Sequence, residues 1–340
     1  MFSELKAAMG RGTPLIIAEL GAKYAELPVM RGMIESAAGC GADMVKFQTY
    51  TADRIAMPGS WFTFEDGSRV SQQEFFRKYE LTEHDHRDLI AHCGQTGIGW
   101  LSTPSSPEDV DLLESFQPSC YKTGSDDLTN LPFLRNIAGR GRPMIVSTGM
   151  CTLGEVEKAV EAIVSTGNRQ LILLHCVVSY PSRPEDANLR AIETLRNAFG
   201  FPIGLSDHTG DEFTSVLATQ LGAVIIEKHF TPDHSMKLPD HEASLDPQQF
   251  RRLVERVHLV SKALGSGVKE ILGTEVKWRA AARKSIVSRR AISAGQKILE
   301  EDLDIRRPAD GIHPHQIELL VGRTAVNDIP AGTLITWDMV

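Results

Sequence analysis

The chain has 340 residues and a formal net charge of −8; 42% of its residues are hydrophobic and 24% are charged, as in an ordinary soluble globular protein. The acidic balance argues against a nucleic-acid partner. The chain has no apolar stretch of membrane-spanning length and no basic-then-hydrophobic N-terminus, so we expect a cytoplasmic protein with no membrane partner. The five cysteines are scattered and include no Cys-x-x-Cys pair, which predicts reduced and mostly buried thiols.

Eight short apolar runs that each end in polar, chemically capable residues are the main pattern along the chain. They cover residues 14–19, 44–48, 99–103, 120–122, 143–147, 171–175, 202–208 and 224–229. Most of the intervals hold an amphipathic segment long enough for a helix, so the sequence predicts an α/β fold, a (β/α)8 TIM barrel. Such barrels place catalytic groups at the C-terminal strand ends, where this chain has Glu19, Lys46, Gln48, Thr103, Lys122, Ser147, His208, Glu227 and His229.

The barrel is expected to form one domain over residues 1–272. The long interval between its second and third strands holds aromatic residues at 61–64 and 75–76. We expect this interval to pack over the barrel, with some lid character. Residues 273–284 are charged and helix-prone, which predicts a linker.

A duplicated pattern follows the linker. Residues 291–298 and 328–335 each read as a short strand, an Ala-Gly turn and a second short strand, followed by an aspartate. This repeat predicts a compact β-rich module with internal pseudo-symmetry over residues 285–340. A module of this size is marginally stable alone, so we expect it to dock onto a barrel of its own chain or of a partner chain.

Two histidines fall at matching ends of neighbouring predicted strands. Alternation along a strand places Ser206 with His208, and Glu227 with His229, on the same face. Because the seventh and eighth strands are neighbours, the two imidazoles can meet. Two imidazoles with open coordination positions suit a divalent metal acting as a Lewis acid. The alternative is a pair of hydrogen-bonded core histidines.

Two lysines end the second and fourth predicted strands. Lys46 and Lys122 each need an anionic partner if buried, and nearby hydroxyls complete a cradle for a phosphorylated, carboxylated substrate. Those hydroxyls belong to Thr103, Ser125, Ser147 and Ser206. The alternatives for the two lysines are internal salt bridges with Glu19, Asp127 or Glu227. A Schiff-base lysine at Lys122 or Lys228 is another reading, although Lys228 has the wrong strand parity, and Cys151 is a further candidate nucleophile.

Motifs along nearly the whole chain resemble those of the sialic acid synthase family, the nonulosonic acid synthases. The matching segments are 17–21, 41–49, 101–104, 121–125, 130–132, 147–150, 174–176, 180–181, 204–209, 227–231 and 239–240. The C-terminal module, with Arg306-Arg-Pro308 and Gly311-Ile312, resembles the antifreeze-like SAF domain of these enzymes. Members of this family condense phosphoenolpyruvate with an N-acetylated amino sugar and release phosphate.

The resemblance implies a role for each matching position. His208 and His229 correspond to ligands of a divalent metal, with Mn²⁺ expected and Mg²⁺ or Co²⁺ as alternatives. Glu19 corresponds to an acid at the barrel floor near the reacting atoms. The positions implied to hold phosphoenolpyruvate are Lys46, Thr103, Lys122, Ser125, Ser147 and Ser206. Those implied to contact the sugar are Gln48, Asp127, Tyr180, Asp240 and Arg307, the last reaching from the SAF domain into the other barrel of a domain-swapped homodimer.

Three departures from the family pattern fall on segments expected to line the pocket. Residues 22–24 read Ala-Lys-Tyr where the family typically has Asn-His, Val178 replaces an Asn or Ser, and Asp127 replaces a Glu. The acceptor therefore stays open between N-acetylmannosamine, a 2,4-diacetamido hexose and another aldose. Rival functions are a Schiff-base aldolase centred on Lys122 and a carbohydrate- or ice-binding module on an inert barrel.

Overall fold

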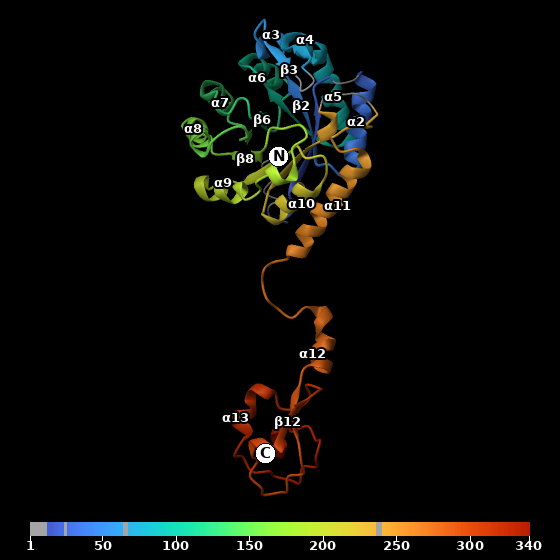
Figure 1. Cartoon of the computed structure of the whole chain (residues 1–340), viewed down its shortest axis with the longest axis vertical. Helices are drawn as coiled ribbons and strands as arrows, with labels where there is room; N and C mark the ends of the chain where they lie inside the picture. Colours follow the sequence, from blue (N-terminus) through green and yellow to red (C-terminus); the bar gives the residue numbers. More distant parts are fainter. Residues whose placement is uncertain (1–11, 24–25, 64–66, 236–239) are drawn as a thin grey trace. The chain divides into compact units, whose positions relative to one another are not determined.

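Two compact units make up the chain, Met1–Gly265 and Ser266–Val340, and each is considered by itself. The computed structural model describes residues 12–23, 26–63, 67–235 and 240–340 (Figure 1). None of the helices within these ranges is long and apolar enough to cross a membrane. The finer division into a barrel to 272, a linker over 273–284 and a module from 285 stays a prediction.

The first unit is built on an eight-stranded parallel sheet, as predicted. Its strands follow the order β5-β2-β1-β10-β9-β8-β7-β6, and β5 and β6 at the two ends also contact each other, which closes the barrel. The strands are β1 (Leu15–Gly21), β2 (Met44–Thr49), β5 (Gly99–Pro104), β6 (Tyr121–Thr123), β7 (Met144–Ser147), β8 (Leu171–Cys176), β9 (Ile203–Asp207) and β10 (Ile225–His229).

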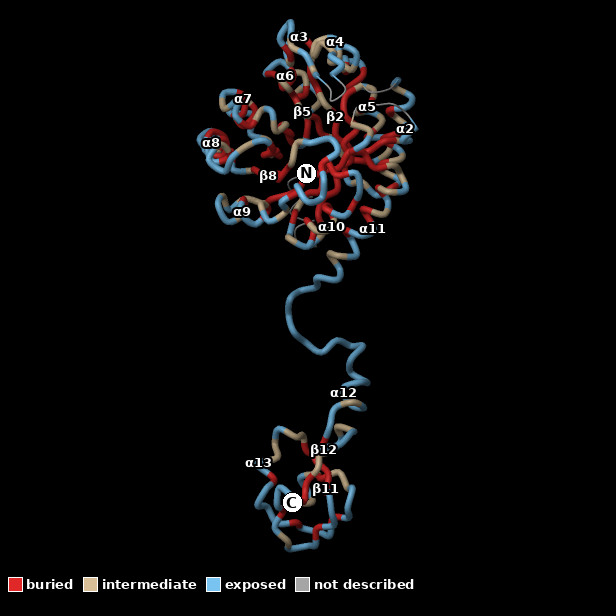
Figure 2. Tube along the Cα trace, in the orientation of Figure 1, coloured by how far each residue is buried: buried red, intermediate tan, exposed pale blue. Residues whose placement is uncertain are grey.

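Helices surround this barrel and cover its outer face (Figures 1 and 2). They are α2 (Leu27–Gly39), α5 (Glu83–Thr96), α6 (Pro107–Glu114), α7 (Leu131–Ala138), α8 (Leu153–Val164), α9 (Ala191–Phe199), α10 (Phe213–Gln220) and α11 (Pro247–Leu264). Local signals start several of them: Thr82, Thr152 and Asp246 form capping boxes at α5, α8 and α11. The buried apolar faces of the helices pack on the outward side chains of the strands.

Strand alternation divides the barrel interior into an apolar layer and a polar layer. The lower interior is filled by a separate apolar cluster: Leu15, Ile17, Met44, Leu101, Cys120, Ile145, Ile172, Leu174 and Ile225. Two residues further along the same strands, the inward positions become polar, for example Glu19 after Ile17 and Glu227 after Ile225. Because a strand repeats every two residues, the polar groups share the inward face and collect at the C-terminal mouth.

Gly204 on β9 allows the inner layer to close. A Cβ at this position would lie 2.6 Å from Leu174 Cδ2 and 2.7 Å from the Ile225 carbonyl oxygen. We expect Gly204→Ala to lower the free energy of unfolding by about 1–3 kcal/mol, because the buried backbone oxygen cannot move aside. Denaturant unfolding measures this, with Gly154→Ala as the control, since a Cβ at Gly154 meets nothing within 4 Å. Equal stabilities of the two variants would contradict the expectation.

The interval between β2 and β5 forms a small aromatic layer. It contains α3 (Ala52–Ile55), the antiparallel strands β3 (Trp61–Thr63) and β4 (Arg69–Ser71), and α4 (Gln72–Tyr79). Phe76 lies edge-on to Tyr50 at a ring-centroid distance of 5.2 Å, and Phe62 and Phe75 complete the cluster. Phe64, which belongs to the predicted aromatic run, lies outside the described residues.

All five cysteines are free thiols, as predicted. Four of them are buried, and Cys151 is half-buried. Burial raises the pKa of the Cys151 thiol, which opposes a nucleophilic thiolate at neutral pH.

The second unit has its own small core around a pseudo-symmetric pair of repeats. Its elements are α12 (Val276–Ala282), β11 (Ser285–Ser288), β12 (Leu303–Arg306) and α13 (Ile317–Leu320), and β11 pairs with β12 in antiparallel fashion. Ile292 and Ile329, at equivalent positions of the two repeats, exchange both backbone hydrogen bonds, at 2.9 and 2.8 Å. Gly295 and Gly332 turn the two repeats with φ of 79° and 77°. The predicted internal pseudo-symmetry is therefore confirmed.

Candidate active site

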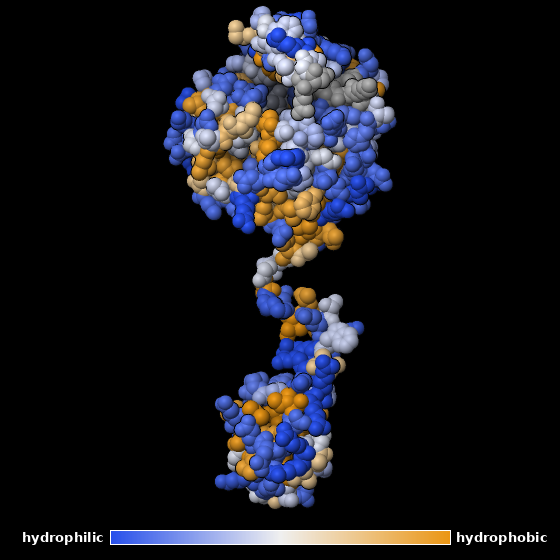
Figure 3. Space-filling model, viewed as in Figure 1, coloured by the Kyte–Doolittle hydropathy of each residue, from blue (hydrophilic) through white to orange (hydrophobic). Residues whose placement is uncertain are grey.

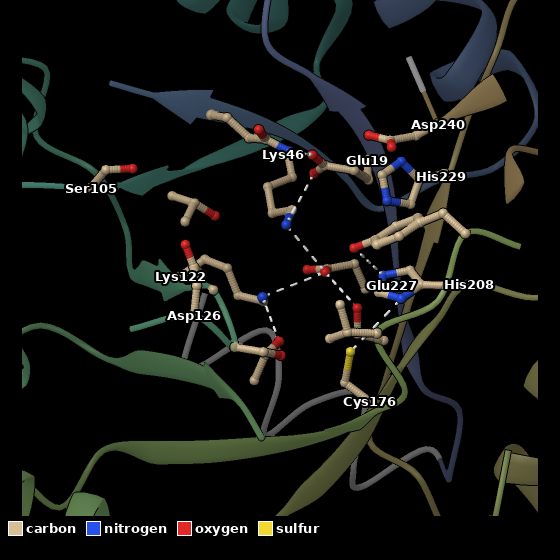
Figure 4. A pocket seen from close by; sticks show the side chains of 18 of the residues that line it. Glu19, Lys46, Ser105, Lys122, Asp126, Cys176, His208, Glu227, His229 and Asp240 are labelled. Atoms are coloured by element: carbon tan, nitrogen blue, oxygen red, sulfur yellow. Dashed lines mark hydrogen bonds and ion pairs between the residues drawn. The ribbon is translucent and has the colours of Figure 1, made fainter. Parts of the chain in front are cut away.

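A polar cavity of about 350 Å³ lies at the C-terminal mouth of the barrel (Figure 4). Each of the eight barrel strands supplies at least one side chain that lines it. Most of the predicted site residues line it: Glu19, Lys46, Gln48, Thr103, Lys122, Ser125, Ser147, Tyr180, Ser206, His208, Glu227, His229 and Asp240. The barrel therefore brings together side chains that are up to 221 positions apart in the chain, from Glu19 to Asp240.

Alternating charges run through the floor of the cavity. Lys46 Nζ lies 3.1 Å from Glu19 Oε2 and 3.2 Å from Glu227 Oε1, and Lys122 Nζ lies 3.5 Å from that same Glu227 oxygen (Figure 4). Lys122 also donates to Ser147 Oγ at 2.7 Å. The internal salt bridges that we weighed as an alternative are thus present with Glu19 and Glu227. Asp127 takes no part in them.

Burial and pairing set the protonation of Glu227, Lys122 and Glu19. Burial raises the pKa of Glu227, but Lys122, Lys46 and the Ser206 hydroxyl outweigh it and lower the pKa to about 2. Burial lowers the pKa of Lys122 more than its carboxylate neighbours raise it. Burial also raises the pKa of Glu19 more than Lys46 lowers it, so Glu19 accepts a proton more readily than Glu227 does. Groups with opposed shifts in one cavity suit acid–base chemistry.

Besides Glu19 Oε2, which lies 3.1 Å from Lys46 Nζ, two buried oxygens at this floor are left without a hydrogen-bond partner in the described chain. They are Thr103 Oγ1 and Glu227 Oε2. Buried polar atoms are nearly always hydrogen-bonded in a native protein, so a bound molecule or water is expected to satisfy them. Both belong to residues that line the cavity.

Three aromatic rings form one side of the mouth. The rings of His208 and His229 lie 5.4 Å apart, and Tyr180 lies 4.2 Å from His208 and 5.7 Å from His229, centroid to centroid. Nδ1 of His208 lies 2.8 Å from the Val177 carbonyl oxygen, which can only accept, so Nδ1 carries the proton and Nε2 carries the lone pair. The Tyr180 hydroxyl lies 3.2 Å from that Nε2.

Both imidazoles are neutral, the form that binds a metal. Burial and the neighbouring His229 lower the pKa of His208 to about 4, and burial lowers the pKa of His229. A backbone hydrogen bond at the far nitrogen is the usual way in which a protein orients a metal-ligating histidine. No group of three or more His, Cys, Asp or Glu side chains within the described ranges is arranged to hold a metal.

Lys228 lies on the other side of the strand. It is fully buried, does not line the cavity and lies 3.2 Å from Asp207 Oδ2. This confirms the parity argument against Lys228 as a Schiff-base lysine.

Some predicted site residues lie outside the cavity. Asp127 accepts from Asn130 Nδ2 at 3.0 Å in the turn before α7, and its neighbour Asp126 lines the cavity instead. Arg307 is exposed on the second unit. Lys23 pairs with Asp85 at 3.0 Å, so this departure from the family pattern does not line the pocket, contrary to our expectation.

The remaining departures from the family pattern are Ala22, Tyr24 and Val178. Ala22 is buried in the core, away from the cavity, whereas Val178 lines it, and Tyr24 lies outside the described residues. The structure also adds lining residues that the sequence analysis missed. Strand parity could have found Tyr50, Ser105 and Cys176, which lie two positions beyond Gln48, Thr103 and Leu174 respectively.

Comparison with known proteins gives two family matches. Residues 33–269 match the NeuB family, and residues 283–340 match the SAF domain. The N,N'-diacetyllegionaminic acid synthase of Campylobacter jejuni is 38% identical, covering 94% of this chain and 98% of its own, and the pseudaminic acid synthase of that organism is 35% identical, covering 93% and 94%. The crystal structure of the N-acetylneuraminic acid synthetase of Leptospira borgpetersenii superposes with a TM-score of 0.71 at 31% identity, covering 79% and 92%.

Proposed function

Because the chain belongs to the NeuB family and ends in a SAF domain, we propose that it condenses phosphoenolpyruvate with an N-acetylated amino sugar to give a nonulosonic acid and phosphate. Relatives across nearly the full length are synthases, and the chain is an enzyme of this class. We take a 2,4-diacetamido hexose as the first candidate acceptor, because the relative at 38% identity makes N,N'-diacetyllegionaminic acid. N-acetylmannosamine is the second.

The observation that carries this proposal is the pair of buried ammonium groups at the cavity floor. Lys46 and Lys122 are 6% and 2% exposed, and each has a carboxylate of the chain within 3.5 Å. A small, multiply charged anion can enter between them, where charge-assisted hydrogen bonds from ammonium and hydroxyl groups are strong. Phosphoenolpyruvate has the carboxylate and phosphate that such a floor requires, and Ser125, Ser147 and Ser206 add hydroxyls.

The chain's own groups account for the steps of the reaction. The methylene carbon of phosphoenolpyruvate attacks the aldehyde carbon of the open-chain sugar, and the aldehyde oxygen takes up a proton from solvent water. Water adds to the resulting cationic C2 and loses a proton to Glu19, whose raised pKa suits this role. The bond between C2 and the phosphate oxygen then breaks, and the C2 hydroxyl gives up its proton to the departing phosphate as the keto group forms. Lys122 and Ser147 stabilise the charge of the phosphate. Holding the two substrates together removes much of the entropic barrier.

His208 and His229 fit a divalent metal, because both are neutral and His208 presents the lone pair of Nε2. We propose Mn²⁺, with Mg²⁺ and Co²⁺ as alternatives. The ion would act as a Lewis acid on the sugar aldehyde. The Tyr180 hydroxyl, 3.2 Å from His208 Nε2, lies beside the position where the ion would bind.

Phosphate release tests the proposed function. The purified chain is incubated with phosphoenolpyruvate and Mn²⁺, with each candidate sugar in turn, and with or without EDTA. Release that depends on the sugar and is abolished by EDTA is the expected result. No release with any sugar from folded, metal-loaded protein would overturn the proposal.

A Schiff-base aldolase at Lys122 is the second candidate, favoured by the burial that lowers the pKa of this ammonium group. Borohydride trapping of a covalent adduct on Lys122, together with activity that resists EDTA, would replace the synthase proposal with this one. The ion pair between Lys122 and Glu227 argues against this candidate, because it favours the protonated ammonium group, which is not a nucleophile.

The domain-swapped homodimer is also a proposal. Apolar side chains gather on the surface at the C-terminal end of α11 (Figure 3), where Leu259 and Leu264 are exposed, and Val276 and Trp278 are exposed in the second unit. Exposed apolar groups of this kind fit a subunit interface.

If Arg307 completes the barrel of the partner, inactive Arg307→Ala and Lys122→Met chains that are unfolded and refolded together will recover about a quarter of the activity. No recovery by dimers of mixed chains would exclude the swap.

The aromatic layer over the mouth is expected to select the acceptor. Ile55, Phe75 and Phe76 line the cavity, and apolar side chains of this kind suit the methyl groups of N-acyl substituents. We expect Phe76→Ala to raise the KM for the sugar about 10-fold and to leave the KM for phosphoenolpyruvate unchanged. Trp61→Ala is the control, since Trp61 lies on the same layer but is 48% exposed and away from the cavity. Equal increases in the two KM values would contradict this role.

A further inference from the structure

A buried polar network lies behind the two candidate metal ligands, on the outer face of β9 and β10. At its centre, Asp207 Oδ1 accepts from Thr209 N at 2.9 Å and from Thr209 Oγ1 at 2.8 Å. Asp207 Oδ2 accepts from Thr214 Oγ1 at 2.6 Å and from Ser215 Oγ at 2.5 Å, and Lys228 Nζ lies 3.2 Å away. All five residues are at most 3% exposed.

The two charges at the centre are register partners in the sheet. Asp207 on β9 pairs directly with Lys228 on β10. Lys228 also donates to the Thr209 carbonyl oxygen and, at 3.2 Å, to Thr209 Oγ1. A slip between the two strands would separate a fully buried ammonium group from all of these acceptors, which is costly. The network therefore fixes the register of β10, which ends in His229, and β9, which His208 directly follows.

The network also reaches the third ring of the site. Thr209, held by Asp207, forms a parallel bridge with Ser182, and Ser182 N donates to the His208 carbonyl oxygen at 2.9 Å. Ser182 lies two residues after Tyr180, on the loop that brings the tyrosine ring against His208. Strand β9, strand β10 and this loop are thus tied together from behind; His208 directly follows β9, His229 ends β10, and the loop carries Tyr180.

We propose that Asp207 and Lys228 are positioning residues, which hold the rings of His208, His229 and Tyr180 in the mutual arrangement that binds the divalent ion and the acceptor. Neither residue lines the cavity, so their effect passes through the backbone of their immediate neighbours. The role in metal and sugar binding rests on the proposed function. The geometric part, the holding of the three rings, does not.

A fully satisfied buried network suits this task better than apolar packing does. Apolar side chains of similar volume often stabilise a protein as much as a buried ion pair, but they tolerate small slips of the packed surfaces. Asp207 and Lys228 together have specific partners in β9, the loop after it, the first turn of α10 and β10. Hydrogen bonds are directional, so bonds to four separate segments permit only one arrangement of the strand ends.

The test compares Asp207→Asn and Lys228→Met with the control Glu114→Gln. Glu114 is also a paired carboxylate, which accepts from Arg142 at 2.9 and 3.0 Å and from the Tyr121 hydroxyl at 2.6 Å, but it lies at the end of α6, away from the cavity. Two readouts are taken on the full chain. One is the ring-current shift that Tyr180 imposes on ¹³C-labelled His208 in the metal-free protein, and the other is the affinity for Mn²⁺ alone.

We expect Asp207→Asn and Lys228→Met to remove most of the ring-current shift of His208 and to weaken Mn²⁺ binding about 10-fold or more, while the control loses stability but keeps both values. Unchanged His208 resonances in the folded variants, or equal changes in the control, would overturn the proposal. If either variant fails to fold, Thr214→Val with Ser215→Ala removes two hydrogen bonds to Asp207 and leaves the ion pair intact. If the wild-type chain binds no Mn²⁺, the proposed metal fails, and the His208 shift alone still decides the positioning role.

Discussion

Replacing Lys122 with methionine is expected to lower kcat/KM for phosphate release by about 10³-fold or more. Lys122 is the buried cation that donates to Ser147 and lies beside Glu227, so its loss leaves the developing phosphate charge without its nearest ammonium group. Methionine keeps the length and apolar stem of the side chain. Steady-state phosphate release with phosphoenolpyruvate, Mn²⁺ and the active acceptor measures the change.

Lys122→Arg is the matched variant for this experiment. Arginine keeps the charge but is larger and places it differently in a site that is 98% buried, so we expect a smaller loss than for methionine. Circular dichroism and the midpoint of thermal unfolding check that both variants fold. A Lys122→Met variant that retains near-wild-type kcat/KM would remove this lysine from the phosphate site and would also exclude the Schiff-base alternative.

Replacing His208 or His229 with glutamine is expected to weaken Mn²⁺ binding by at least about 100-fold, because each change removes one of the two neutral imidazoles at the mouth. Glutamine keeps a polar side chain of comparable length but offers no imidazole nitrogen. Equilibrium dialysis of the metal-free chain against Mn²⁺ measures the affinity, and activity is expected to fall in parallel.

His241→Gln is the control for the histidine variants. His241 bonds to Thr231 Oγ1 at 3.1 Å on the loop after β10 and does not line the cavity, so the affinity for Mn²⁺ should not change. If His208→Gln and His229→Gln bind Mn²⁺ as tightly as the wild type, the two residues are hydrogen-bonded core histidines, the alternative that the sequence left open.

The fold was predictable because its signals are local. Each barrel strand is a short apolar run, and several are followed at a short distance by a capping residue that starts the next helix, as at Ser106 before α6 and Thr152 before α8. Eight such units in succession have few architectures open to them, and a closed parallel barrel is the common one. The observed strand bounds differ only slightly from the predicted ones; for example, the run predicted over 202–208 forms β9 over Ile203–Asp207.

The candidate site was predictable as far as strand alternation reaches. Lys46, Ser206 and Glu227 face the cavity because they share parity with the apolar residues of the inner layer below them. The same rule extended by one step finds Tyr50 and Ser105. Strand alternation gives no help in loops, because no fixed period relates neighbouring side chains in a loop. In the loop after β6 the family pattern pointed to Asp127, but the fold brings Asp126 to the cavity.

The sequence by itself determined which residues face inward and that acids, lysines and histidines would collect at one mouth, because a two-residue period and a polar strand end are properties of each strand alone. Tertiary structure alone decided their partners. Glu227 on β10 reaches Lys46 two strands away along the sheet and Lys122 four strands away, and the contact with Lys122 requires the sheet to curl into a barrel. Tyr180 lies against His208 because the strands that precede them, β8 and β9, pair in the sheet, and no single segment encodes that pairing.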